Sequence, residues 1–98
     1  MEWWRGPLSV MHVSVRGRVQ GVGFRWFVRE RARALGLAGW VRNDPDGSVK
    51  VYAVGPEPDL QDLRRILEHG PPAAHVESVE DDQHEPSAPA FKPFGVLR

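Results

Sequence analysis

Two glycines and an arginine in the stretch GRVQGVGFR, residues 17 to 25, have the types and the spacing that bind an anion. Gly21 and Gly23 can adopt backbone conformations that a side chain blocks, so consecutive N–H groups can turn toward one bound group. Arg25 follows two residues later and offers a planar pair of donors, which matches two oxygens of one phosphoryl group. The stretch therefore predicts a site for a terminal phosphate.

A purely structural explanation fits the same residues. A tight connection from a strand to a helix needs glycine without any ligand, and an arginine in the first turn of a helix is often only a surface charge. The local pattern alone leaves both explanations open.

Hydrophobic periodicity predicts the elements that must position this stretch. Apolar residues alternate before it, as in a strand, and from Phe24 they follow a helical stripe with Gly36 as the stop. A DPDG turn separates two later alternating segments. In chain order we expect a strand at 8–17, a helix from Phe24, strands at 38–43 and 48–54, a helix opened by Pro56 and Pro58 that ends near Gly70, and a strand at 75–81.

This order predicts an α+β fold, the ferredoxin-like βαββαβ sandwich, with two helices on one face of an antiparallel or mixed sheet. Val76 and Val79 are out of phase, which indicates a bulge in the last of these strands. The end of the chain, FKPFGVLR, can add a short fifth strand, at an edge because of Pro93. The first and second strands run in the same direction, so Asn43 and the glycine turn reach one edge of the sheet.

Composition narrows the class of protein. The 98 residues suffice for one domain, which we place at residues 10 to 98 after an N-terminal extension of residues 1 to 9. The absence of cysteine excludes thiol catalysis, disulfides and cysteine metal sites. Neither a membrane span nor a secretory signal is recognisable, so we expect a cytoplasmic protein.

The net charge of zero hides an uneven distribution. Residues 1 to 42 carry eight arginines and two glutamates, a net charge of +6, and the remainder carries −6. A basic first half around the glycine turn favours a small anionic ligand.

Three linked segments closely resemble the acylphosphatase family: GRVQGVGFR, the helix end ALGLAGWVRN, and DGSVKVYAVG. Further along, LEHGPPAAHVESVE is similar to the end of the family's second helix and its fourth strand. The resemblance covers most of residues 10 to 80, and several motifs in the right order are far more specific than any one of them.

The resemblance implies a hydrolase that converts acyl phosphates, which are carboxyl-phosphate mixed anhydrides, to carboxylate and inorganic phosphate without a metal or other cofactor. Arg25 would be the catalytic arginine, and Asn43 would be the catalytic asparagine that positions the attacking water. The phosphate-binding loop would consist of Val19, Gln20, Gly21, Val22, Gly23, Phe24 and Arg25.

Other residues capable of chemistry have simpler interpretations. The four histidines lack metal-ligand spacing and are expected at the surface: His12, His69, His75 and His84. We interpret Asp81, Asp82 and Glu85 as an acidic strand end and loop, and Asp44 and Asp46 as supports of the turn after Asn43. Trp26 and Trp40 have the chemistry to stack on a ligand, although Trp40 better suits packing against the sheet or a helix.

Two other classes of function compete with an enzyme. The same element order occurs in RNA-binding domains, but the third strand offers only Tyr52 as an aromatic, and we expect no nucleic-acid partner. A noncatalytic module that binds phosphate or handles carbamoyl phosphate would keep Arg25 without needing Asn43. Both residues are present, which favours an enzyme. We expect a monomer that acts on a small acyl phosphate and releases inorganic phosphate, and nothing in the sequence identifies a pocket for the acyl group.

Overall fold

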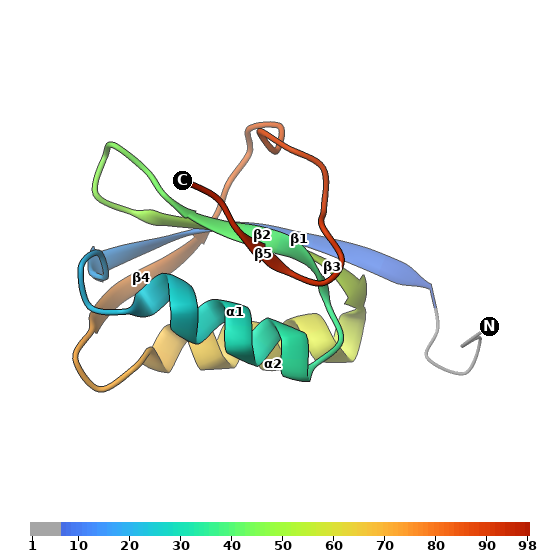
Figure 1. Cartoon of the computed structure of the whole chain (residues 1–98), viewed down its shortest axis with the longest axis horizontal. Helices are drawn as coiled ribbons and strands as arrows, with labels where there is room; N and C mark the ends of the chain where they lie inside the picture. The colour runs from blue at the N-terminus through green and yellow to red at the C-terminus, as the bar shows by residue number, and fades with distance from the viewer. Residues whose placement is uncertain (1–6) are drawn as a thin grey trace.

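A five-stranded sheet organises the chain, of which the computed structural model describes residues 7 to 98. The strand order across the sheet is β4-β1-β3-β2-β5, and only the β2–β5 pair is parallel. Both helices cover one face of this sheet (Figure 1). The ferredoxin-like prediction is thereby confirmed. The elements are β1 (Leu8–Arg18), α1 (Phe24–Ala34), β2 (Ala38–Asn43), β3 (Val49–Pro56), α2 (Glu57–His69), β4 (His75–Asp81) and β5 (Gly95–Val96).

The core lies between the sheet and the helices. Alternate residues of β1 and β3 point toward the helices, and each helix supplies three buried residues at intervals of three or four. These spacings put the apolar side chains on one face of each element, which is what holds the two layers together. The buried hydrophobic residues of these four elements are Met11, Val13, Val15, Val49, Val51, Ala53, Phe24, Val28, Ala32, Leu60, Leu63 and Leu67.

The two irregular strands agree with their sequence patterns. Along β4, Ser78 lies opposite Arg16 while Val76 lies opposite Gly17, so Glu77 is an extra residue and the predicted bulge is confirmed. The predicted edge strand is also confirmed as β5, which pairs with the outer side of β2. The expected N-terminal extension falls mainly on residues 1 to 6, which lie outside the described residues.

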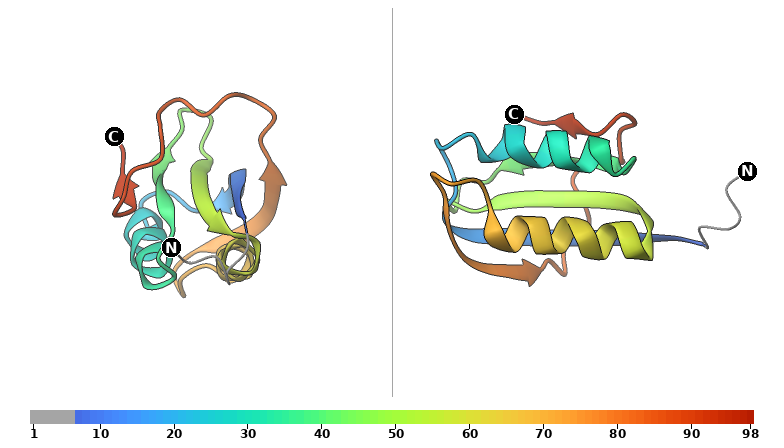
Figure 2. Two further views of the ribbon diagram at one scale, coloured as in Figure 1. Left: turned by 90° about the vertical axis from the view of Figure 1, so that its right-hand side faces the viewer. Right: turned by 90° about the horizontal axis from the view of Figure 1, so that it is seen from below.

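The second face of the sheet is covered by the connection between β4 and β5, which crosses it on the side away from the helices (Figures 1 and 2). Trp40 is fully buried beneath this connection and its indole N–H donates to the Ala88 carbonyl at 2.9 Å. Trp40 therefore packs against the sheet, as predicted. The connection supplies the cover that a third layer would provide in a larger domain.

The prediction that all four histidines are exposed is wrong for His12, whose side chain is only 11% exposed. Its ring contacts those of Trp40 and Tyr52, with centroids 5.9 and 5.8 Å away, and its Nδ1 is 3.1 Å from the His84 carbonyl oxygen. The alternation in the first strand correctly placed His12 on the face opposite the core. The sequence did not reveal that the polar connection between β4 and β5 folds over this face and buries His12.

Asp82 holds the start of this connection in place. Its side chain is 7% exposed, and it accepts hydrogen bonds of 2.9 Å from the backbone N–H and the ring Nδ1 of His84. Lys50 Nζ lies 3.4 Å from the other carboxylate oxygen. The backbone hydrogen bond from His84 is the largest cause that lowers the pKa of the Asp82 carboxyl, the neighbouring His12 and Lys50 lower it further, and partial burial opposes them.

We expect Asp82→Asn to lower the free energy of unfolding at pH 7 by about 1–3 kcal/mol, because the ionised partner of these donors is lost. The folded-state pKa of Asp82 is depressed, so its contribution is complete above the ordinary Asp value of about 4 and is lost as the pH falls toward the folded-state value. Urea unfolding from pH 7 down to pH 3 should therefore show a shallower acid loss in the variant. Asp81→Asn is the matched control, because the Asp81 side chain is 70% exposed. Parallel curves for wild type and Asp82→Asn would contradict this role.

Candidate active site

The connection between β1 and α1 contains two glycines in a left-handed backbone conformation. Gly21 and Gly23 have φ angles of 74° and 76°, in the left-handed region, and a Cβ atom at either position would have nothing within 4 Å of it. Backbone conformation alone therefore requires glycine here. Within residues 7 to 98, no side chain caps α1 and its first turn carries no acidic residue. The first N–H groups of α1 are left for a ligand, and the helix dipole favours an anion.

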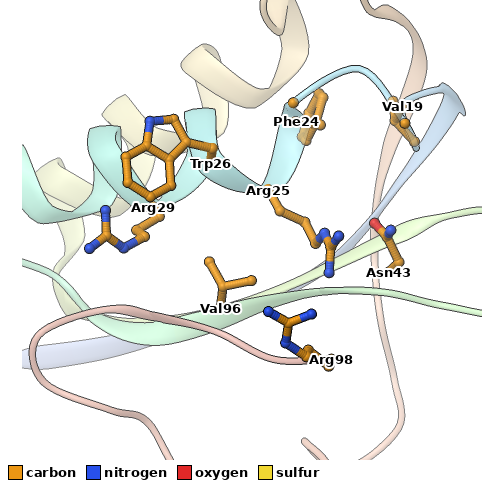
Figure 3. Close-up of a pocket in the computed structure, with 10 residues that line it drawn as sticks. Val19, Phe24, Arg25, Trp26, Arg29, Asn43, Val96 and Arg98 are labelled. Atoms are coloured by element: carbon orange, nitrogen blue, oxygen red, sulfur yellow. The ribbon is translucent and has the colours of Figure 1, made fainter.

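These amides open onto a cavity of about 420 Å³ at one edge of the sheet. Arg25 reaches into it from the first turn of α1, and Asn43 reaches into it from the end of β2 (Figure 3). The two strands that lead to these residues, β1 and β2, both run antiparallel to β3 and so end at the same edge. The full lining consists of Val19, Gly21, Gly23, Phe24, Arg25, Trp26, Arg29, Asn43, Val96 and Arg98.

The polar side chains at the centre of the cavity are free to bind. Among residues 7 to 98, neither the Arg25 guanidinium nor the Asn43 amide has a hydrogen-bond or ion-pair partner. Both side chains are half-buried at the cavity, and their donors are available to a ligand bound between them. The cavity lining also contains no acidic side chain in the part of the chain that the structure describes. An anion is the ligand that this arrangement suits.

Gln20 fixes the position of Asn43 relative to the glycine turn. Its side-chain amide donates to the carbonyls of Asp44 and Ser48, at 2.8 and 2.9 Å, and both belong to the turn that follows β2. Asp44 also accepts from Arg42 at 2.7 Å, and Asp46 accepts from the Ser48 hydroxyl and backbone N–H. The prediction that Asp44 and Asp46 support this turn is confirmed.

The predicted loop residues divide into two groups. Val19, Gly21, Gly23, Phe24 and Arg25 line the cavity, whereas Gln20 and Val22 do not. The Gln20 side chain faces the β2–β3 turn, and Val22 packs against the hydrophobic core.

Four residues that line the cavity were not predicted as site residues: Trp26, Arg29, Val96 and Arg98. Trp26 was recognised only as a residue able to stack on a ligand, and Arg29 lies one helical turn after Arg25. The spacing of Arg25 and Arg29 was therefore an available signal. Val96 and Arg98 gave none, because they enter the site only through the parallel pairing of β5 with β2.

Residues 7 to 98 contain neither a candidate metal-binding cluster nor a membrane-spanning helix. No three of their histidine, aspartate or glutamate side chains are grouped so that they could hold a metal ion. No helix in this part of the chain is long and apolar enough to cross a membrane.

Comparison with known proteins identifies relatives of this chain. The acylphosphatase family model matches residues 11 to 95. An acylphosphatase of Salinibacter ruber is 50% identical over 93 residues, which make up 95% of this chain and 97% of that relative. The crystal structure of acylphosphatase from Bacillus subtilis superposes with a TM-score of 0.76 at 37% identity, over 94% of this chain and all of that one.

A longer protein contains a similar unit. Full-length HypF, in its phosphate- and nucleotide-bound form, matches with a TM-score of 0.79 at 26% identity, over 94% of this chain and only 12% of that chain. The match over nearly the whole length of the Salinibacter and Bacillus proteins, together with the family model, settles the assignment. The chain belongs to the acylphosphatase family, whose members are hydrolases of acyl phosphates.

Proposed function

We propose that this chain hydrolyses small acyl phosphates without a metal, that Arg25 and the amides of residues 19 to 25 bind the phosphoryl group, and that Asn43 positions the attacking water. One observation carries the proposal. The unpaired Arg25 guanidinium, the unpaired Asn43 amide and the uncapped start of α1 all face one cavity that contains no acidic side chain among the described residues.

The chemistry explains why so few groups suffice. The water oxygen bonds to phosphorus while the bond from phosphorus to the acyl oxygen breaks, and the acyl group leaves as a carboxylate. A carboxylate is a weak base that departs unprotonated, so no general acid is needed. The proton of the attacking water passes to an oxygen of the phosphoryl group, which becomes inorganic phosphate.

The residues supply charge stabilisation and placement. Phosphoryl transfer is loose, and it mainly requires that negative charge be stabilised and that the nucleophile be in line with the leaving group. Arg25 and the loop amides stabilise the charge on the phosphoryl oxygens, and Asn43 holds the water by hydrogen bonding.

We propose that the hydrolysis takes place in the cytoplasm and that the protein acts as a monomer.

The alternative is a module that binds phosphate or handles carbamoyl phosphate without turnover. The likeness to one part of HypF, solved in a phosphate- and nucleotide-bound form, is compatible with the phosphate-binding version of this alternative. Asn43 favours the enzyme, because a binding site for phosphate alone does not need an unpaired amide beside the guanidinium.

The proposal is tested by hydrolysis of benzoyl phosphate with an excess of EDTA. We expect steady turnover that EDTA does not change, and competitive inhibition by inorganic phosphate. If phosphate binds but benzoyl phosphate is never hydrolysed faster than in buffer, the site is a binding module. Loss of turnover in EDTA, with recovery on adding a divalent metal, would reject the metal-independent mechanism.

A further inference from the structure

Arg98 enters the active-site cavity from the segment that follows β5. The parallel pairing of β5 with β2 places Val96 opposite Val41, and the backbone N–H of Leu97 donates to the Val41 carbonyl at 2.9 Å. Two residues further in the same register, Arg98 lies alongside Asn43, the last residue of β2. The sheet therefore brings Arg98 to the same edge as Asn43.

The Arg98 guanidinium lies at the end of the cavity that holds the polar groups of the site. Figure 3 shows it on the same side as Arg25 and Asn43, whereas Trp26 and Arg29 lie further along α1. Arg25 approaches from α1 and Arg98 from the opposite wall, so the two guanidinium groups face a common space. An anion bound in this space can contact both of them.

These two guanidinium groups carry like charges that no neighbour compensates. Neither Arg25 nor Arg98 has a hydrogen-bond or ion-pair partner within the described residues, whereas the third arginine of the lining, Arg29, is 2.5 Å from the Glu30 carboxylate. Two positive charges that share one cavity repel each other, and an anion that binds between them removes the repulsion. A phosphoryl group carries about 1.5 to 2 negative charges at pH 7, which is more than one arginine compensates.

We propose that Arg98 is a second arginine of the phosphoryl site and binds the phosphoryl oxygens together with Arg25. The inference rests on the proposed function and adds a binding residue to its site. Arg25 and the loop amides hold the phosphoryl group from the α1 side, and Arg98 neutralises the remaining charge from the β5 side. Because phosphoryl transfer mainly requires that the charge on these oxygens be stabilised, Arg98 contributes to turnover as well as to binding.

The test measures phosphate binding and hydrolysis in Arg98→Gln. We expect calorimetric titration with inorganic phosphate to show binding weakened by about 10-fold, and kcat/KM for benzoyl phosphate to fall by about 10-fold or more. The loss should be smaller than in Arg25→Gln, because Arg98 is exposed and solvent screens part of its charge. Arg98→Lys should retain part of the affinity, since it keeps the charge but loses the planar pair of donors.

Lys92→Gln is the matched control for the loss of one positive charge. Lys92 belongs to the same final segment of the chain and is exposed, but it does not line this cavity. Its substitution should leave both phosphate affinity and kcat/KM close to those of wild type.

Thermal unfolding separates ligand binding from a purely structural role. Without phosphate, Arg98→Gln should have a melting temperature no lower than that of wild type, because the repulsion with Arg25 is relieved. When the same concentration of phosphate is added to both proteins, the melting temperature should rise less in the variant, because it binds phosphate more weakly.

The other outcomes can be told apart. If Arg98→Gln binds phosphate as tightly as wild type does, Arg98 is not a phosphate ligand and the inference is wrong, even if kcat/KM falls. A lower melting temperature without phosphate, together with an unchanged rise on adding it, would make Arg98 a structural residue. If phosphate affinity falls as expected but wild type does not hydrolyse benzoyl phosphate, Arg98 still belongs to the anion site and the proposed function alone fails.

Discussion

Arg25→Gln should lower kcat/KM for benzoyl phosphate by about 10²- to 10⁴-fold, because two charge-assisted hydrogen bonds of about 1.5–3 kcal/mol each are removed from the phosphoryl group. Arg25 has no partner in the described structure that a substitution would leave buried, so the fold should tolerate the change. The affinity for inorganic phosphate should fall with the catalytic efficiency. Steady-state kinetics and calorimetric titration with phosphate measure both quantities.

Arg31→Gln is the matched control for Arg25→Gln. Arg31 lies on the same helix, but its guanidinium is 5.0 Å from the centre of the Phe27 ring and it does not line the cavity. We expect near wild-type kinetics from this variant. Arg25→Lys should recover only a small part of the loss, because a point charge cannot replace the planar pair of donors. Wild-type phosphate affinity in Arg25→Gln would refute the assignment of Arg25.

Asn43→Ala should lower kcat by about 10²- to 10³-fold, which is the typical effect of removing one preorganised hydrogen-bonding group from a site. Phosphate affinity should stay close to that of wild type, because the bound water and not the phosphoryl group is the proposed partner of Asn43. The backbone of Asn43 pairs with Val49 at the end of the sheet, and alanine preserves that pairing.

The contrast between kcat and phosphate affinity is what tests the role of Asn43. A large loss of phosphate affinity with little change in kcat would make it a phosphate ligand. Gln20→Ala gives a useful comparison, since Gln20 lies outside the cavity and contacts the turn after β2 only through its side chain. It should perturb kcat less than Asn43→Ala, because it displaces the asparagine without removing it.

Most of the fold was predictable because the hydrophobic pattern of each segment matches the residues that the structure buries. The stripe that begins at Phe24 became α1, with Gly36 just beyond its end, and the out-of-phase Val76 and Val79 correctly indicated the bulge. Even the interruption at Pro93 was informative, since it limited the final strand to a short edge position. These features depend on neighbours in the sequence, which is why the sequence alone reveals them.

The errors and omissions come from contacts between distant segments. His12 alternates as a surface residue would, and only the return of residues 82 to 94 across the sheet buries it. Arg98 likewise has no local pattern, because its position depends on a parallel pairing with a strand more than fifty residues earlier. The location of Arg25 and Asn43 at one edge was accessible, since it follows from strand direction alone.

The cavity is built from segments that are far apart in the chain: the β1–α1 connection, the end of β2 and the residues after β5. They meet only when the sheet has formed, so an unfolded chain has no equivalent site. A ligand that binds only the folded state stabilises it by mass action, by about 2.7 kcal/mol at a concentration 100 times its Kd. In the proposed function, accumulating product would therefore protect the enzyme against unfolding at the same time as it inhibits it. A rise in the concentration of inorganic phosphate would raise the melting temperature and lower the rate of turnover.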